Sequence, residues 1–396
     1  MDLLHAAFIG TYAPTQCGLA TFTSALRRAM SPGLSLPESP VIRVLDAPAP
    51  VGAPRPCEVL YDWHHGDRTA VEQVLAVLDD RDICVIQHEY GIFDGPDGNE
   101  IIEVIKRSPV PTIVVLHTVL AHPTPTQRAV LEAVIAAASV VITQSGAARR
   151  ALLKSFSVDA AKIHVIPHGA APNIADTNLN GPSHPSLGIP TILTWGLIGP
   201  GKGLEVAIKA FAQLDDLGVA PRYIIAGQTH PKVIAHEGER YRHSLMALAA
   251  ELNVSDRVVF DSRYRTIPEL NALISAADIV LLPYESREQV TSGVLVEALA
   301  SGKPVVATAF PHAREVLASG AGTVVPHDAP DAMASALRSL LTNPKHSAIT
   351  SAHAERIGRG LFWPEIGRRY LALAHQTIAS SIASQSSDPL LMNVGA

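Results

Sequence analysis

Short runs of β-branched and other apolar residues alternate with longer helix-periodic stretches along almost the whole chain. A strand that is buried on both faces reads as a continuous apolar run, so this alternation predicts parallel sheets covered by helices on both sides. In the first half, the predicted strands are Ala6–Thr11, Val41–Leu45, Ile83–His88, Thr112–His117, Val140–Thr143 and Ile163–Pro167. The predicted helices between them include Leu19–Met30, Arg68–Leu78 and Thr126–Ala138.

Residues 171–190 interrupt this pattern with a segment rich in Pro, Gly, Asn and Ser, a composition typical of a domain boundary. The alternation then resumes, with predicted strands at Thr191–Trp195, Tyr223–Ala226, Arg257–Phe260, Ile279–Pro283, Pro304–Thr308 and Gly322–Val325. The expected fold is α/β, with two doubly wound, Rossmann-like domains that face an interdomain cleft. Ligands of such sheets bind outside the carboxyl ends of the strands, so that cleft is the expected site.

The composition supports folded domains and excludes several classes of protein. The chain has 396 residues, of which 47 % are hydrophobic, enough for two or three cores and too many for a disordered chain. With 31 Lys and Arg against 37 Asp and Glu, the formal charge is −6, so we expect no nucleic-acid partner.

Targeting and redox signals point to the cytoplasm. The sequence start, MDLLH, lacks the basic residues of a signal peptide, and no apolar run reaches the roughly 20 residues that a bilayer requires. Cys17, Cys57 and Cys84 are too few and too scattered for a disulfide framework or a zinc knuckle. We expect free thiols in a cytoplasmic protein without a transmembrane segment.

In the first half, several predicted strands end in glycine or polar residues. Gly18 lies between a strand and a helix, where the backbone can approach an anion closely, although a single glycine there is more often structural. His88, His117 and His168 follow three other strands. One such histidine is more often a core or surface residue, but three at equivalent strand ends favour a binding cleft.

The second half contains a stronger signal, the segment TWGLIGPGKG at 194–203, which lies between a predicted strand and a helix. Four glycines and Lys202 in this position suit a phosphate cradle, in which backbone N–H groups and one cation contact the oxygens. The segment matches neither the P-loop nor the dinucleotide-binding pattern, and a structural turn is the alternative.

A second candidate element begins at Thr291 and Ser292, both good helix N-caps. The N–H groups of Gly293 and Val294 would then be free to contact an anion. Glu297 lies one turn further along an otherwise apolar helix, where a carboxylate can accept hydrogen bonds from the hydroxyls of a sugar. The alternative is a solvated carboxylate, which the apolar surroundings disfavour.

Together these motifs resemble the retaining glycosyltransferases of family 4, which have the GT-B fold. The resemblance rests on PYESREQVTSGVLVEALASGKPVVAT, GLIGPGKG and VIPHG in the second half, and on TYAPTQCGLATF, QHEYGIF and VLHT in the first. It covers roughly residues 1–379. It implies an acceptor-binding domain at 1–175, a donor-binding domain at 188–360, a crossover helix at about 362–379 anchored by Trp363, and a flexible tail at 380–396.

The resemblance also implies roles for individual residues. His117, Lys202 and Glu297 are the expected catalytic residues: Lys202 grips the donor diphosphate, Glu297 contacts the ribose and His117 approaches the donor sugar. The residues expected to bind the donor are Gly18, Gly196, Gly201, Lys202, Arg263, Gln289, Thr291, Ser292, Gly293, Val294 and Glu297. The expected acceptor-side residues are His88, Glu89, Tyr90, His117, Thr118 and His168.

Two positions depart from the family pattern. Gln289 stands where relatives have the first of two glutamates, which indicates a subgroup preference, because an amide can still bond a sugar hydroxyl. Leu197 stands where relatives often have an arginine that faces the diphosphate, and Arg263 or Arg287 could replace that cation.

The expected reaction is transfer of a hexose, with mannose favoured, from a nucleoside diphosphate sugar to a saccharide or glycolipid hydroxyl. The resemblance implies retention by a front-face route, and we expect no cofactor and no metal. GDP-mannose is favoured over UDP-glucose as donor, and a homodimer stays open. The alternatives are a sugar-nucleotide epimerase, a pyridoxal-phosphate-dependent phosphorylase, and a non-catalytic protein that binds nucleotide sugars or glycans. Gln289 and Leu197 favour the last of these.

Overall fold

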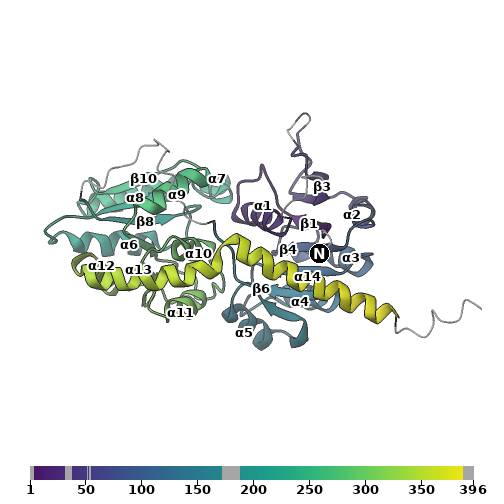
Figure 1. Cartoon of the computed structure of the whole chain (residues 1–396). Helices are drawn as coiled ribbons and strands as arrows, with labels where there is room; N and C mark the ends of the chain where they lie inside the picture. Colours follow the sequence, from purple (N-terminus) through teal and green to yellow (C-terminus); the bar gives the residue numbers. More distant parts are fainter. Residues whose placement is uncertain (1–3, 32–37, 51, 53–54, 172–187, 387–396) are drawn as a thin grey trace, which may run out of the picture. The chain divides into compact units, whose positions relative to one another are not determined.

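The computed structural model describes residues 4–31, 38–50, 52, 55–171 and 188–386. The chain divides into two compact units (Figure 1). Unit 1 comprises Met1–Gly169 and Trp363–Ala396, and unit 2 comprises Ala170–Phe362. The Pro- and Gly-rich segment expected to form the boundary lies largely outside the described residues. It belongs to the amino-terminal end of unit 2, which begins at Ala170.

Unit 1 is built on a parallel sheet of seven strands in the order β3-β2-β1-β4-β5-β6-β7. These strands are β1 (Ala6–Gly10), β2 (Val41–Leu45), β3 (Val59–His64), β4 (Ile83–His88), β5 (Thr112–Leu116), β6 (Val140–Thr143) and β7 (Ile163–Val165). The α-helices of the unit are α1 (Gly18–Met30), α2 (Ala70–Leu78), α3 (Ile101–Arg107), α4 (Pro125–Ala137), α5 (Gly146–Ser155) and α14 (Trp363–Ser386). Among the described residues, the unit also contains the 3₁₀ turns η2 (Pro96–Gly98) and η3 (Ala160–Lys162).

Unit 2 is built on a parallel sheet of six strands in the order β10-β9-β8-β11-β12-β13. These strands are β8 (Thr191–Trp195), β9 (Arg222–Ala226), β10 (Val258–Asp261), β11 (Ile279–Leu282), β12 (Val305–Thr308) and β13 (Gly322–Val325). The helices are α6 (Leu204–Phe211), η4 (Ala212–Leu214), α7 (Pro231–Glu237), α8 (Arg240–Glu251), α9 (Ile267–Ala276), α10 (Gly293–Ala300), α11 (Pro311–Leu317), α12 (Pro330–Thr342), α13 (Pro344–Gly358) and η5 (Arg359–Leu361).

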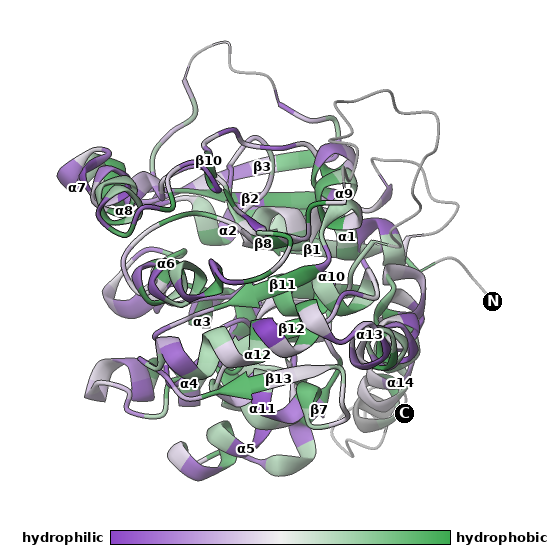
Figure 2. Cartoon of the chain, turned by 90° about the vertical axis from the view of Figure 1, so that its left-hand side faces the viewer, coloured by the Kyte–Doolittle hydropathy of each residue, from purple (hydrophilic) through white to green (hydrophobic). Residues whose placement is uncertain are grey.

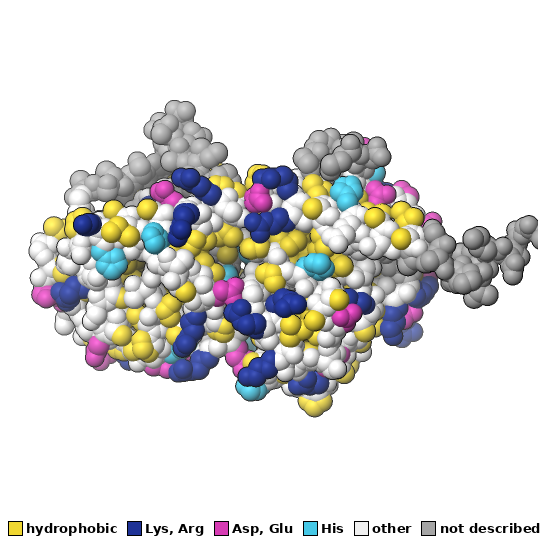
Figure 3. Space-filling model, turned by 60° about the horizontal axis from the view of Figure 1, so that its bottom comes forward, with side chains coloured by type: hydrophobic (Ala, Val, Ile, Leu, Met, Phe, Trp, Pro, Cys, Tyr) yellow, Lys and Arg dark blue, Asp and Glu magenta, His cyan; other side chains and the backbone are white. Residues whose placement is uncertain are grey.

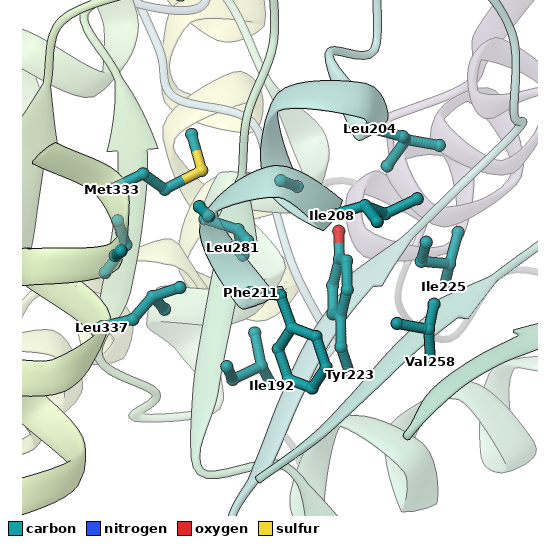
Figure 4. Packing of buried hydrophobic residues seen from close by; sticks show 14 of the residues in the cluster. Ile192, Leu204, Ile208, Phe211, Tyr223, Ile225, Val258, Leu281, Met333 and Leu337 are labelled. Carbon is teal, nitrogen blue, oxygen red and sulfur yellow. The ribbon is translucent and has the colours of Figure 1, made fainter. Parts of the chain in front are cut away.

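The core of unit 2 shows why its strands read as apolar runs. Strand β11, with the sequence IVLL, is green in Figure 2, and its side chains are buried on both faces of the sheet. On one face, α6 and α12 pack over the sheet, and Figure 4 shows the rings of Phe211 and Tyr223 side by side. The centroids of these two rings are 5.7 Å apart. Such packing gives the strand ends a rigid base.

Helix α14 belongs to unit 1 through its own buried residues. Ile366, Tyr370 and Leu373 lie in the same core as α1 and the sheet of that unit. The two helices approach closely at Gly367, where a Cβ atom would lie 2.4 Å from the carbonyl oxygen of Ala29. A residue with a side chain at this position would force α14 away from α1.

Some predicted elements need correction. Strand β3 was not predicted, because Tyr61 and Asp62 break its apolar run, which is possible at the edge of a sheet where one side is open. The crossover helix predicted at about 362–379 is longer, since α14 continues to Ser386 and includes the first residues of the predicted flexible tail. Residues 387–396 of the expected tail lie outside the described part.

The surface of the described residues is mixed in charge. On the face seen in Figure 3, lysine and arginine side chains lie interspersed with aspartate and glutamate. A search of the helices among those residues found none with the length and apolar character needed to cross a membrane.

Candidate functional site

Each sheet has one point at which the strand order reverses direction. In unit 1 it lies between β1 and β4, and in unit 2 between β8 and β11. Loops at the carboxyl ends of such neighbouring strands diverge, and the space between them is where doubly wound sheets bind ligands. Most of the predicted donor-side and acceptor-side residues follow these strands or the next strand along each sheet, whereas Arg263 follows β10 and His168 follows β7.

In unit 2, the loop after β8 is glycine-rich because the backbone requires it. Gly196, Gly201 and Gly203 have φ angles of 121°, 88° and 65°, which residues with a side chain rarely adopt. Gly203 lies against β11's following loop, and a Cβ atom there would be 1.9 Å from the carbonyl oxygen of Pro283. A Cβ at Gly196 or Gly201 would meet no atom within 4 Å. The loop is thus anchored on one side and open beside two glycines.

Lys202 extends from this loop over an aromatic ring. Its Nζ atom lies 4.6 Å from the centroid of the Tyr284 ring, and burial lowers the pKa of its ammonium group. Within the part of the chain that the structure describes, no carboxylate forms an ion pair with it. A buried ammonium is stabilised only in part by a ring face, so this lysine is suited to pair with an anionic ligand.

The start of α10 lies close to the same tyrosine. Ser292 caps the helix, because its Oγ accepts a 3.2 Å hydrogen bond from the N–H of Leu295, and its side chain lies close to the Tyr284 hydroxyl. The backbone N–H of Ser292 donates to Nδ1 of His312 at 2.9 Å. The amides of Gly293 and Val294 lie in the first turn, where a helix has no carbonyl of its own for them. Lys202 and these amides therefore converge around Tyr284.

Glu297 is not a solvated carboxylate. Its Oε2 accepts a 3.0 Å hydrogen bond from the indole N–H of Trp195, the last residue of β8, and burial raises the pKa of the carboxyl group. The Gln289 side chain orders the loop before α10, because its amide donates to the carbonyl of Thr291 at 3.1 Å. The Thr291 hydroxyl is buried with no partner among the described residues.

The proposed replacement cations have other partners. Arg263 bonds Asp261 through both Nε and Nη2, at 3.1 and 2.9 Å, and this pairing lowers the pKa of the Asp261 carboxyl. Arg287 lies 3.5 Å from Asp328 on the surface. Both arginines are exposed and paired with a carboxylate, so the prediction that one of them supplies the cation missing at Leu197 stays a prediction.

In unit 1, His117 is held by two glutamines. Its Nε2 lies 2.8 Å from Oε1 of Gln87, and its Nδ1 lies 3.0 Å from Nε2 of Gln144. Phe22 packs on this ring in a T-shaped arrangement, with centroids 4.8 Å apart. Burial, followed by the nearby His168 and His88, lowers the pKa of His117 to about 3. The imidazole is therefore neutral at physiological pH.

The other two predicted histidines, His168 and His88, lie near His117, and His168 packs on the same phenylalanine, Phe22. His168 packs on Phe22 and Trp363, with centroid distances of 4.9 and 5.8 Å, and its Nδ1 donates to the carbonyl of Gly169. His88 is 1 % exposed, so the prediction that it points out of the sheet into an open cleft is wrong. Burial lowers the pKa of each of these rings to about 4.

Glu89 and Thr118 connect two strand ends. The Thr118 hydroxyl donates a 2.7 Å hydrogen bond to Oε2 of Glu89, and burial raises the pKa of that carboxyl group. The hydroxyl of the adjacent Tyr90 donates to the carbonyl of Gln127. These residues place a carboxylate, without a cationic partner among the described residues, at the carboxyl end of β4.

Gly18 is the first residue of α1, and Cys17 is its N-cap. A Cβ atom at Gly18 would meet nothing within 4 Å, so this helix start has open space beside it. The preceding loop is fixed by Arg43, which is 2 % exposed and donates to the carbonyl of Ala13 at 2.8 Å. The expected loop and helix start are therefore present.

Comparison with known proteins adds the family. The model of the family described as Glycosyl transferases group 1 matches residues 182–356, and that of Glycosyltransferase Family 4 matches residues 41–173. The two matches lie on the two sheets described above. The chain belongs to the family 4 glycosyltransferases.

Relatives of this glycosyltransferase are distant. A D-inositol 3-phosphate glycosyltransferase of Kineococcus radiotolerans is 29 % identical over 288 residues, which are 67 % of this chain and 64 % of that protein. A GDP-mannose-dependent alpha-(1-6)-phosphatidylinositol monomannoside mannosyltransferase of Mycolicibacterium smegmatis is 30 % identical over 167 residues, or 40 % of each chain. The glycosyltransferase thus matches less than two thirds of the length of these relatives.

The fold agrees with solved structures. HepE from Anabaena, solved in complex with UDP, matches 96 % of this glycosyltransferase and 100 % of its own chain, with a TM-score of 0.72 and 19 % sequence identity. This similarity, with the two parallel sheets, shows the GT-B fold of two Rossmann-like domains.

Sequence reasoning missed several residues of this glycosyltransferase's candidate site. Gln144 and His312 follow β6 and β12, and the rule that polar residues after buried strands face a ligand site would have found both. Trp195 ends a predicted strand and was interpreted only as part of it. Arg43 lies within a strand, and no local signal marks it as a support for a distant loop.

Proposed function

We propose that this chain transfers a hexose from a nucleoside diphosphate sugar to the hydroxyl of a saccharide or glycolipid, with retention at the anomeric carbon. The observation that carries the proposal is the arrangement around Tyr284. An ammonium group without a carboxylate partner among the described residues lies over its ring, and Ser292 at the start of α10 lies close to its hydroxyl. A diphosphate supplies the negative charge that such an arrangement lacks.

The donor we propose is GDP-mannose, with UDP-glucose second. The mycolicibacterial relative, whose name states dependence on GDP-mannose, supports the first choice, and HepE, solved with UDP, supports the second. The nucleotide sugar is a co-substrate, and we propose that no other cofactor takes part. Glu297, bonded through Oε2 to Trp195, keeps Oε1 for hydroxyls of the donor's ribose.

The difficult step is departure of the diphosphate, since positive charge grows on the sugar ring as the bond to C1 breaks. The electron pair of that bond goes to the phosphate oxygen, where Lys202 and the amides of Gly293 and Val294 stabilise it. The acceptor oxygen then forms the new bond to C1 on the same face, and its proton passes to the departing phosphate. His117 is not the base, because both ring nitrogens are already hydrogen-bonded.

A charge-removing substitution tests this function. Lys202→Ala should lower transfer by about 10²–10³-fold, the usual effect of removing one group that stabilises charge in the transition state. Lys209→Ala, on the exposed side of α6, is the matched control and should transfer at the wild-type rate. The measurement is product formation by mass spectrometry, with GDP, UDP and ADP sugars as donors and a panel of saccharide acceptors.

Other outcomes decide between the remaining functions. If Lys202→Ala transfers hexose at the wild-type rate, Lys202 takes no part in the mechanism. Thermal stabilisation by a nucleotide sugar without transfer to any acceptor would favour the non-catalytic binding protein, for which Gln289 and Leu197 argue. Conversion of the donor to an epimer without acceptor would identify an epimerase.

A further inference from the structure

Gln87, His117 and Gln144 come from the ends of three neighbouring strands, β4, β5 and β6. The two glutamines are 0 % and 1 % exposed. Each directs one end of its amide at a different nitrogen of the His117 ring, at 2.8 and 3.0 Å. Burying an amide costs free energy unless its polar atoms are hydrogen-bonded. Each of these amides has one hydrogen bond, to the ring, and one atom without a partner among the described residues, so their burial is costly unless His117 requires both.

The hydrogen-bond roles follow from the chemistry of the three groups. The carbonyl oxygen of Gln87 can only accept, so Nε2 of His117 carries the proton, and the amide of Gln144 donates to Nδ1. A neutral imidazole, with one donor and one acceptor, satisfies this pattern. An imidazolium needs an acceptor at both nitrogens, so the Gln144 amide would have to turn its oxygen to Nδ1. Its N–H group would then be buried where the described residues offer no acceptor, which costs free energy.

Reversing both amides gives the same result. Nε2 of Gln87 would then donate and Oε1 of Gln144 would accept, so the ring would again be neutral, in the other tautomer. The remaining amide atoms, Nε2 of Gln87 and Oε1 of Gln144, have no partner among the described residues, so neither orientation is favoured by a further bond. The two titratable neighbours that act on the ring, His88 and His168, both oppose a positive charge on it.

From this geometry we infer that Gln87 and Gln144 are positioning residues that hold His117 as a neutral ring with a fixed orientation. The inference rests on the proposed function, in which His117 lies on the acceptor side of the reaction. In this role the His117 ring is an uncharged group of fixed orientation that lines the site and packs against Phe22. The two glutamines then have a role that neither could fulfil alone, because one partner would leave the ring free to rotate or to take up a proton.

The direct test is ¹⁵N NMR of the full-length protein labelled at histidine, with His117 assigned from the loss of its signals in His117→Gln. The wild-type ring should show one neutral tautomer from pH 7.5 down to pH 5. Gln144→Glu replaces the donor by a carboxylate, so His117 should gain a proton at about the pH of an ordinary histidine, near 6.5. Gln73→Glu, on the exposed side of α2, is the matched control and should leave the His117 signals unchanged.

A second variant covers the case in which Gln144→Glu does not fold. Gln87→Glu puts a carboxylate beside Nε2 instead, and it should also move protonation of His117 into the same pH range. A wild-type His117 that protonates near pH 6.5, or a ring that stays neutral in both folded variants, would overturn the inference.

Kinetics separates this inference from the proposed function. In the wild type, the rate of hexose transfer should show no acid limb from His117 between pH 5 and 7.5, whereas the variant Gln144→Glu should acquire one. A glutamine with a purely structural role would change stability and leave the pH profile alone, and that outcome would contradict the inference. If no transfer is found at all, the proposed function fails, while the NMR titration still decides whether the glutamines hold the ring neutral.

Discussion

The indole N–H of Trp195 donates a 3.0 Å hydrogen bond to Oε2 of Glu297 and so joins the end of β8 to the second turn of α10. Strand β8 directly precedes the glycine loop that places Lys202 over Tyr284, and the first turn of α10 lies close to the same tyrosine. The bond therefore fixes the direction of the carboxylate relative to Lys202, and it leaves the second carboxylate oxygen for a ligand.

Glu297→Gln tests this arrangement. The amide keeps an oxygen for the indole but can turn an N–H toward the ligand, so donor binding should weaken by about 1.5–3 kcal/mol, the usual contribution of a hydrogen bond to a charged group. Isothermal titration with GDP-mannose and UDP-glucose measures it. Trp195→Phe, which retains Glu297 but frees its orientation, should weaken binding less. Equal affinity of all three proteins would show that Glu297 does not contact the donor.

Gly203→Ala should damage the glycine loop. The residue has a φ angle of 65°, and a Cβ atom would lie 1.9 Å from the backbone oxygen of Pro283. We expect a loss of at least about 1–3 kcal/mol in the stability of unit 2, together with weaker donor binding. The matched control is Gly218→Ala, since a Cβ there meets nothing within 4 Å. Urea unfolding of both variants is the measurement, and equal midpoints would contradict the prediction.

Acid should destabilise unit 1 through its buried histidines. The pKa is lowered to about 3 for His117 and to about 4 for His88 and His168, whereas an unfolded histidine titrates near 6.5. Below about pH 6.5 the unfolded chain thus binds more protons than the folded one. Stability is complete above that pH and should fall by up to about 1.4 kcal/mol per histidine for each pH unit toward 4.

Urea unfolding at pH 7.5 and 5.5 measures this dependence. His168→Gln should reduce the loss between the two pH values, because one of the three rings no longer titrates in the unfolded state. His236→Gln, at an exposed position of α7, should leave it unchanged. A wild-type stability that is equal at both pH values would show that these histidines are hydrated or protonated in the folded protein.

Glu89 should influence which acceptors are used. Its carboxylate is bonded by Thr118, has no cationic partner among the described residues, and is destabilised by burial. Such a group favours acceptors that donate hydroxyl protons and repels phosphates. We therefore expect neutral saccharides to be better acceptors than their phosphorylated forms, and Glu89→Gln to narrow that difference. Transfer to glucose and glucose 6-phosphate, or to inositol and inositol 3-phosphate, gives the ratio. A wild-type preference for the phosphorylated members would contradict the expectation.

Much of the fold follows from local pattern. Buried parallel strands must be apolar along their whole length, so periodicity placed twelve of the thirteen strands in the described part of the chain within a residue or two. It missed β3, whose edge position permits polar residues. Glycine in a strand-to-helix loop, and Ser292 before an apolar helix, are equally local signals, and the structure has a φ of 121° at Gly196 and a capped helix at Ser292.

The partners of the candidate site residues were decided only by the tertiary structure. No spacing indicates that Lys202 lies over Tyr284, that Arg263 is taken up by Asp261, or that Gln144 reaches the ring of His117. The periodicity of apolar residues indicates which side of a helix or strand is buried, and it depends only on residues close together in the sequence. A hydrogen bond or an ion pair between residues far apart in sequence depends on how the strands are ordered and how their ends diverge, and only the folded sheets supply those distances.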